Sequence, residues 1–176
     1  METYIALLRG INVGGHKKIL MADLRRFFEK LNFKNVKTYI QSGNVIFQSN
    51  EEKIEVLESK IKGQILNEYG FEVSVLVKTH SEIEDILNIC PFKEGKKDKS
   101  YFIVLHSNPD KKLVNSTMEI KYPNEEFHII NSCVYIYYSL GSGKAKCGTN
   151  FFEKKLKVSA TARNYNTLNK LVELSN

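Results

Sequence analysis

The sequence of 176 residues contains no tryptophan, three prolines and three cysteines. Because the number of cysteines is odd and none of them forms a CxxC pair, the sequence argues against a disulfide framework and a cysteine-based zinc site. The four histidines are scattered, without an HxH or HxxxH pair. We therefore expect neither a bound metal ion nor a cofactor.

Long apolar segments are also missing. No stretch approaches the roughly 20 apolar residues that a membrane helix requires, and the first residues, Met1–Tyr4, lack the basic and apolar segments of a secretory signal. Hydrophobic residues make up 42% of the chain and charged residues 26%, which is ordinary for a globular protein. We expect a cytoplasmic protein without membrane contacts.

Positive charge is abundant and unevenly placed. The net charge is +6, and the segment from Lys144 to Lys170 holds seven basic residues and one acidic residue. Such a segment is either a solvated lysine surface or a phosphate-binding one. Lysine is far more frequent than arginine, which favours the solvated surface because arginine is the usual residue for planar phosphate recognition.

Hydrophobic periodicity predicts two similar halves. In the first half it predicts a strand, a helix, a hairpin, a helix and a strand over residues 4–8, 21–31, 36–48, 54–65 and 71–77. Ser42–Gly43 forms the predicted two-residue turn of the hairpin. The resulting order, β-α-β-β-α-β, is that of a ferredoxin-like unit.

The pattern then restarts. It predicts a strand at 101–105, a helix opened by Asn108–Pro109, a hairpin at 125–138 turning at Asn131–Ser132, a helix from Asn150 and a weak strand at 158–161. A last helix carries Leu168, Leu171 and Val172. Since Ile40–Val45 aligns with Ile129–Val134, we infer an internal duplication. The predicted class is α+β, with ferredoxin-like subdomains at 1–79 and 100–176, a helix and linker at 80–99, and a C-terminal helix in the second.

Strand parity assigns the two faces of each predicted hairpin. One face is apolar and should lie under the helices. The opposite face carries Tyr39, Gln41 and Asn44 in the first hairpin and Tyr135 and Tyr137 in the second. Because a ferredoxin-like sheet has helices on one side, this tyrosine-rich face is expected to be open, as a ligand groove or as a protein contact.

Four segments resemble one protein family. They are LRGINVGG at 8–15, MADL at 21–24, TYIQSGNV at 38–45 and TARNYNT at 161–167, and they are similar to the bacterial family called domain of unknown function 1697. That family usually has tryptophan where this chain has Tyr165. The resemblance implies two ferredoxin-like subdomains and supplies no activity.

The glycine-rich loop after the first strand is the leading candidate site. Such a loop can direct backbone N–H groups toward an anion, but GxxxxGK[ST] is not matched, so a P-loop is not expected. We predict a binding module for an anionic or polar small molecule, such as a phosphorylated metabolite or nucleotide. The candidate residues are Arg9, Asn12, Gly14, Gly15, Gln41, Ser42, Gly43, Asn44, Arg163 and Asn164. Arg163 is predicted to open a helix, where its charge opposes the helix dipole.

Two alternatives remain open, and no residue pattern identifies an enzyme. Single-stranded nucleic acid could stack on the open faces and contact the basic C-terminal segment. The residues for that alternative are Tyr39, Tyr135, Tyr137, Lys144, Lys146, Lys154 and Lys155. The second alternative is a self-association or regulatory role for the open faces, and the sequence does not give the oligomeric state.

Overall fold

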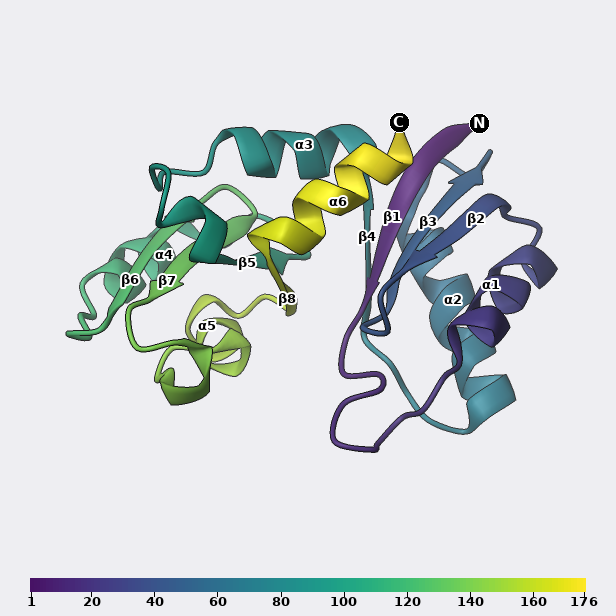
Figure 1. The fold of residues 1–176 in the computed structure, drawn as a ribbon, viewed down its shortest axis with the longest axis horizontal. Coiled ribbons are helices and arrows are strands. Elements are labelled where there is room, and N and C mark those ends of the chain that lie inside the picture. Colours follow the sequence, from purple (N-terminus) through teal and green to yellow (C-terminus); the bar gives the residue numbers. More distant parts are fainter. The chain divides into compact units, whose positions relative to one another are not determined.

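The computed structural model describes residues 1–176, which divide into two compact units (Figure 1). One unit comprises Met1–Glu84 together with Lys170–Asn176, and the other comprises Asp85–Asn169. Each contains one four-stranded antiparallel sheet. The fold class is therefore confirmed as α+β with duplicated ferredoxin-like units. None of the helices combines the length and apolar character needed to cross a bilayer.

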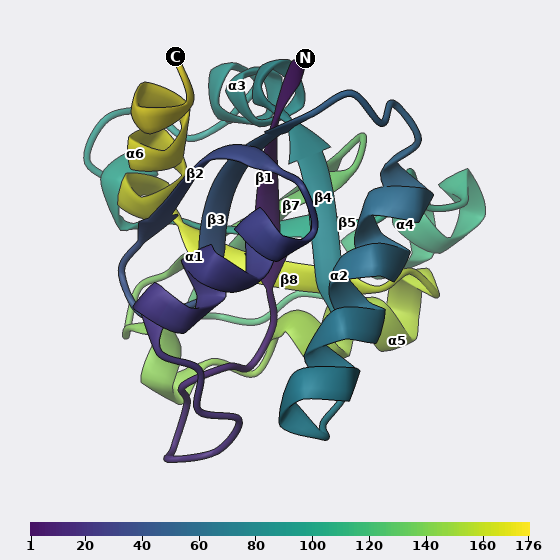
Figure 2. The ribbon, with the colours of Figure 1, turned by 90° about the vertical axis from the view of Figure 1, so that its right-hand side faces the viewer.

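The first unit has the β-α-β-β-α-β order that the sequence predicts. Its elements are β1 (Glu2–Leu8), α1 (Met21–Lys30), β2 (Lys34–Tyr39), β3 (Asn44–Ser49), α2 (Ile54–Tyr69) and β4 (Val75–Thr79), followed by α3 (His80–Asn88). The strand order is β2-β3-β1-β4. Because both crossovers are long connections of the same hand, α1 and α2 lie on the same face of the sheet (Figure 2).

The second unit repeats this arrangement. Its elements are η1 (Lys97–Lys99), β5 (Tyr101–Leu105), α4 (Lys111–Met118), β6 (Glu125–Ile130), β7 (Cys133–Tyr138), η2 (Ser142–Lys144), α5 (Thr149–Leu156) and β8 (Ala160–Asn164), and α6 (Tyr165–Ser175) follows. The strand order is β6-β7-β5-β8. The last strand lies about two residues later than the predicted 158–161.

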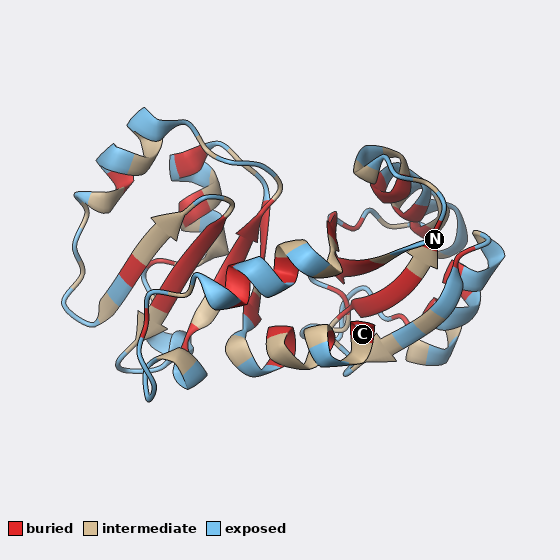
Figure 3. Cartoon of the chain, turned by 90° about the horizontal axis from the view of Figure 1, so that it is seen from above, coloured by how far each residue is buried: buried red, intermediate tan, exposed pale blue.

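Apolar residues form one core between sheet and helices in each unit, visible as the buried stretches of the strands in Figure 3. In the first, the rings of Phe28, Phe33 and Phe47 contact one another with centroids 4.5–5.7 Å apart. In the second, Phe127 and Phe152 meet edge to face at 5.1 Å. Such pairs add specific ring contacts to the hydrophobic burial of the core.

The two hairpins differ in their turns. Ile130 pairs with Cys133, so the two-residue turn Asn131–Ser132 is confirmed. In the first hairpin Tyr39 pairs with Asn44, so the turn has four residues, 40–43. The prediction of a Ser42–Gly43 turn flanked by paired Gln41 and Asn44 was therefore wrong. The assignment of the faces was unaffected, because two extra turn residues preserve strand parity.

Backbone contacts confirm the duplication near these turns. Leu8 N donates to Gly43 O and Leu105 N donates to Ser132 O, both at 2.8 Å. One residue later, Arg9 and His106 donate their N–H groups to Ser74 and Ser159. The chain therefore leaves the central strand through equivalent hydrogen bonds in the two units.

Residues 85–99 cover part of the helix-free face of the second sheet. Tyr135 is 1% exposed, and its hydroxyl donates to the carbonyl of Ile86 at 2.8 Å. The Phe92 ring contacts His128 and Tyr137 edge-on. The expectation of an open face consequently does not hold at Tyr135, because Ile86 in α3 contacts its hydroxyl and the side chain is buried.

The end of α6 lies beside the helix-free face of the first sheet. Lys37 Nζ donates to the carbonyl of Leu174 at 3.0 Å, and His80 Nδ1 lies 2.7 Å from Ser175 Oγ. These contacts fix the last turn of α6 within the first unit. The prediction from sequence had placed the whole helix with the second subdomain.

Candidate functional site

Residues 9–20 connect β1 to α1 in an irregular loop with an unusual backbone. Five of its residues have positive φ: Gly10, Asn12, Gly14, Gly15 and Lys17, at 47–78°. Glycine adopts this conformation without steric cost, and asparagine tolerates it better than most residues. The loop therefore depends on its glycines for its path.

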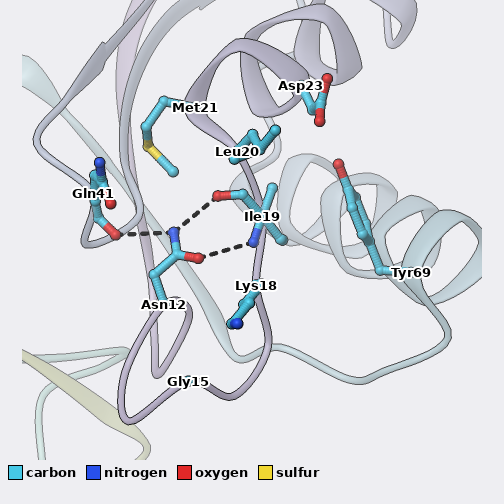
Figure 4. A pocket seen from close by; sticks show the side chains of 9 residues that line it. All are labelled: Asn12, Gly15, Lys18, Ile19, Leu20, Met21, Asp23, Gln41 and Tyr69. Atoms are coloured by element: carbon cyan, nitrogen blue, oxygen red, sulfur yellow. Dashed lines mark hydrogen bonds between the residues drawn. The ribbon is translucent and has the colours of Figure 1, made fainter.

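Asn12 closes the loop with its side chain (Figure 4). Its Nδ2 donates to the carbonyls of Ile19 at 2.9 Å and Gln41 at 3.0 Å, and its Oδ1 accepts the N–H of Ile19 at 2.9 Å. Asn12 N also donates to Lys17 O at 3.2 Å. Both ends of the loop and the hairpin turn are thus tied to one amide.

A pocket of about 390 Å³ opens beside this amide (Figure 4). It is lined by Asn12, Gly15, Lys18, Ile19, Leu20, Met21, Asp23, Gln41 and Tyr69. The volume lies in the range of small-molecule sites, which combine apolar walls with a few polar groups. Three of the candidate residues from sequence, Asn12, Gly15 and Gln41, meet here.

The first turn of α1 forms one side of the pocket. Its N-cap residue, Leu20, is 72% exposed and makes no side-chain capping hydrogen bond. The N–H groups of a first helical turn have no partner within the helix, and they carry the positive end of the dipole. In the same turn the Asp23 carboxylate forms an ion pair with Arg26, which offsets its negative charge.

Two further polar groups reach this region from other positions. Lys18 is exposed at the end of the loop and brings an ammonium group to the rim. Tyr69, at the end of α2, turns its hydroxyl toward the start of α1 (Figure 4). Burial, together with the charge of Asp23, raises the pKa of Tyr69, so the hydroxyl stays protonated and can donate.

Ser42, Gly43 and Asn44 shape the hairpin turn and are absent from the pocket lining. Asn44 is fully buried and donates to Tyr39 O at 3.0 Å and Ser42 Oγ at 2.8 Å. A Cβ on Gly43 would lie 2.7 Å from the Leu8 Cβ. These residues therefore hold the turn against β1, and the turn in its place positions Gln41.

Arg9, Gly14, Arg163 and Asn164 do not line the pocket. Arg9 is half-buried and Gly14 is exposed. Arg163 lies in β8 of the second unit and not at a helix start as predicted, because the strand extends past it. Its Nη1 donates to Thr161 Oγ1 and to Ala162 O, and burial lowers its pKa to about 10. Asn164 accepts the N–H of Thr167 at 2.8 Å and so caps α6.

The residues of the nucleic-acid alternative are distributed over both units. Tyr39 and Tyr137 are half-buried, whereas Tyr135 is buried in the second unit. A base cannot stack on Tyr135 in this conformation, because its ring is covered. Four lysines are exposed, Lys144, Lys146, Lys154 and Lys155, and they lie in η2, in the segment after it and in α5.

The chain contains no close group of three or more His, Cys, Asp or Glu side chains suited to hold a metal ion. The three cysteines are free thiols, of which Cys133 and Cys147 are buried. Burial raises the pKa of Cys133 and of Cys147, the latter to about 12. Both thiols therefore stay protonated and unreactive at neutral pH.

A family profile described as "Protein of unknown function (DUF1697)" matches residues 1–135. The chain belongs to this family. The matched segment includes the β1–α1 loop, the first hairpin and Tyr69, and therefore every residue that lines the pocket. The resemblance noted in the sequence is thereby confirmed.

Among solved structures, the chain is similar to "conserved bacterial protein SP0830 from Streptococcus pneumoniae". The TM-score is 0.77 at 24% sequence identity, and the alignment covers 99% of each chain. At this identity the likeness shows the fold alone. No curated protein matches the sequence.

Lys18, Leu20 and Tyr69 line the pocket but were missed in the sequence. Lys18 is one of many lysines, and Tyr69 lies more than forty residues away, at the end of a helix whose pattern indicates only burial. Leu20 carried a signal that the sequence shows: an apolar residue directly precedes the helix predicted from Met21, where Ser, Thr, Asp or Asn is usual.

Proposed function

We propose that the first unit binds a small anionic molecule, of the size of a phosphorylated metabolite or a nucleotide, in the pocket at the start of α1. The observation that carries this proposal is the uncapped first turn of α1 at the wall of a pocket that also receives Lys18. Helix N-termini bind phosphate and carboxylate groups through their N–H groups and dipole.

The pocket supplies groups for both ends of such a ligand. The first-turn N–H groups and Lys18 suit the anionic group, while the Tyr69 hydroxyl and the Gln41 amide suit neutral polar atoms. Ile19 and Met21 supply apolar contact area. Because Asn12 already fixes the loop, ligand binding need not be accompanied by loop ordering, which favours affinity.

The test is an NMR titration of the ¹⁵N-labelled full chain with inorganic phosphate and with adenosine monophosphate. We expect the amide signals of Gly15, Met21 and Ala22 to shift, and the mononucleotide to bind more tightly than phosphate alone. The amide of Lys112, at the start of α4, serves as an internal control because Asp110 already caps that helix.

Two variants at one exposed position separate charge from hydrogen bonding. Leu20→Asp places a carboxylate on the first-turn N–H groups and should abolish the shifts, because the anion is repelled and its donors are occupied. Leu20→Asn caps the helix without charge and should weaken them less. Unshifted amides at millimolar ligand, or an unchanged response in Leu20→Asp, would contradict the proposal.

A further inference from the structure

The two units differ in charge. The first unit holds 13 lysine and arginine residues against 12 aspartate and glutamate residues, and the second holds 13 against 8. The net charge of +6 therefore lies almost entirely in the second unit. Excess positive charge attracts polyanions over distances of about one Debye length, near 8–10 Å at physiological salt.

Part of this charge lies beside two aromatic rings on the helix-bearing side of the second sheet. The half-buried rings of Tyr122 and Phe151 meet edge to face with centroids 6.1 Å apart. Lys146 Nζ lies 5.9 Å from the centroid of Tyr122, and Lys155 Nζ lies 5.9 Å from that of Phe151. We call these four residues, with Lys144, the Tyr122–Phe151 patch.

Lys144, Lys146 and Tyr122 border one hollow of about 180 Å³. Phe151 and Lys155 are four residues apart on α5, so they share a helix face, and Lys154 is exposed next to them. Cations and rings thus alternate over a continuous surface formed by residues 122–124, the segment before α5, and α5 itself.

Two carboxylates of the segments that form the patch are engaged within the protein. Both oxygens of Glu125 accept backbone N–H groups, one from Lys146 and one from Cys147. Glu153 directly precedes Lys154 and Lys155 on α5, and it accepts the N–H of Ala160 at 2.8 Å. The Glu125 carboxylate holds the segment with Lys146 in place, and Glu153 joins α5 to the start of β8. The lysines of the patch are exposed.

The Glu125 contacts also make the patch rigid. The Tyr138 hydroxyl donates to Cys147 O at 2.8 Å, and Cys147 itself is fully buried. The segment carrying Lys144 and Lys146 is therefore anchored at its centre, although it has little regular structure. A preformed surface loses less conformational entropy on binding.

We propose that the Tyr122–Phe151 patch binds single-stranded nucleic acid. Aromatic rings stack on bases regardless of sequence, and neighbouring lysines neutralise phosphates. An unpaired strand fits this pattern better than a duplex, because the bases of a duplex are already stacked. The patch lies on the side of the second sheet opposite to Tyr135, and its residues belong to the second unit, whereas those of the anion pocket belong to the first.

The test is fluorescence anisotropy of the full chain with a labelled oligothymidylate of roughly 15 nucleotides, the scale of one single-strand binding site. We expect salt-sensitive binding that is weaker for a duplex of equal length. The Lys146→Ala, Lys155→Ala double variant should reduce the slope of log affinity against log salt by about 1.4, at about 0.7 per phosphate contact. Tyr122→Leu should weaken binding roughly 5- to 150-fold, the effect of losing one stacked base.

Charge-matched and ring-matched controls come from the first unit. Lys34→Ala with Lys60→Ala removes the same charge from exposed strand and helix positions, and Phe71→Leu removes a half-buried ring; both should leave binding unchanged. Leu20→Asp should also bind normally, so the two sites are distinguishable. The lysine positions are exposed, so the double variant stays folded even if Tyr122→Leu does not.

Three results would overturn the proposal. The first is the absence of salt-sensitive oligonucleotide binding. The second is equal weakening by the patch variant and its charge-matched control, which would indicate attraction by net charge alone. The third is binding to vesicles containing anionic lipid without binding to the oligonucleotide, which would assign the surface to a membrane.

Discussion

In the first unit the chain passes from β1 to α1 through residues 9–20, whereas in the second it passes from β5 to α4 through residues 106–110. Both connections leave the central strand through equivalent backbone hydrogen bonds. They then differ at the helix start. Asp110 accepts the N–H of Lys112 at 2.8 Å, while Leu20 caps nothing.

The hollow at the start of α4 differs from the pocket at the start of α1. It has a volume of about 280 Å³ and is bordered by Asn108, Pro109, Lys111 and Asn131, among others, on the loop and on the hairpin turn. A carboxylate of the protein already occupies the helix start there. The duplicated fold thus builds the same strand-to-helix connection twice. In the first unit, where the loop is longer, the N–H groups at the helix start have no side-chain cap.

The largest expected difference is in the stability lost when the two hairpin turns are mutated at equivalent positions. Gly43→Ala should lower the free energy of unfolding by about 2–5 kcal/mol, because φ is +77° and the new Cβ would overlap Leu8. Ser132→Ala at the equivalent position should cost less than about 0.5 kcal/mol. Urea denaturation followed by circular dichroism measures both. Equal losses would show that the turns are not under different constraints.

Asn12→Ala should have the next largest effect. It removes three side-chain hydrogen bonds of the β1–α1 loop, at a cost of about 2–4 kcal/mol. Hydrogen exchange should then speed up in residues 9–20. Asn108→Ala, in the shorter loop of the second unit, should change stability by less than about 0.5 kcal/mol. If loop exchange is unaffected in Asn12→Ala, the loop is held by other contacts.

Removing the side-chain cap of α4 and adding one to α1 tests whether the two helix starts differ as described. Asp110→Ala should destabilise the second unit by about 1 kcal/mol, and Leu20→Asp should stabilise the first by about 0.5–1 kcal/mol. Thermal unfolding of both single variants and the double variant measures these changes. Additive effects are expected because the sites share no partner; a destabilised Leu20→Asp would mean that α1 is capped in another way.

The smallest effects concern two exposed carboxylates, one in each unit. Hydrogen bonds from Lys30 and Lys96 lower the pKa of Glu68 and of Glu126, respectively. The stabilisation from each pair is present above the unfolded pKa and is lost as the pH falls through the folded pKa. NMR titration should show that Lys30→Ala raises the pKa of Glu68 alone, and that Lys96→Ala raises the pKa of Glu126 alone. Cross-effects would contradict independent pairs.

The fold could be predicted from the sequence because strand parity and helical spacing are local signals. Even the wrong turn at Ser42–Gly43 left the faces correct, since the error was two residues. The loss of the open face at Tyr135 could not be predicted. It depends on Ile86, in the segment predicted as a helix and linker, whose carbonyl accepts a hydrogen bond from the Tyr135 hydroxyl. The sequence carries no local signal for that contact.

The candidate site was predicted in part, for a related reason. Asn12, Gly15 and Gln41 were predicted from a glycine loop and a polar turn, which are visible in sequence. Lys18 was missed because nothing distinguishes it from the many other lysines of the chain. Tyr69 depends on where α2 ends relative to α1, a tertiary relation without a local signal. Arg163 was misplaced because the end of β8 is set by its pairing with β5.

The path of α6 has a consequence for dissecting this protein. Its final turn, at Leu174 and Ser175, supplies partners to Lys37 and His80, so the first unit is discontinuous in sequence. A fragment ending at residue 84 would lack those partners. A version of that unit that keeps them would graft residues 170–176 onto residue 84 through a designed linker, or would permute the chain.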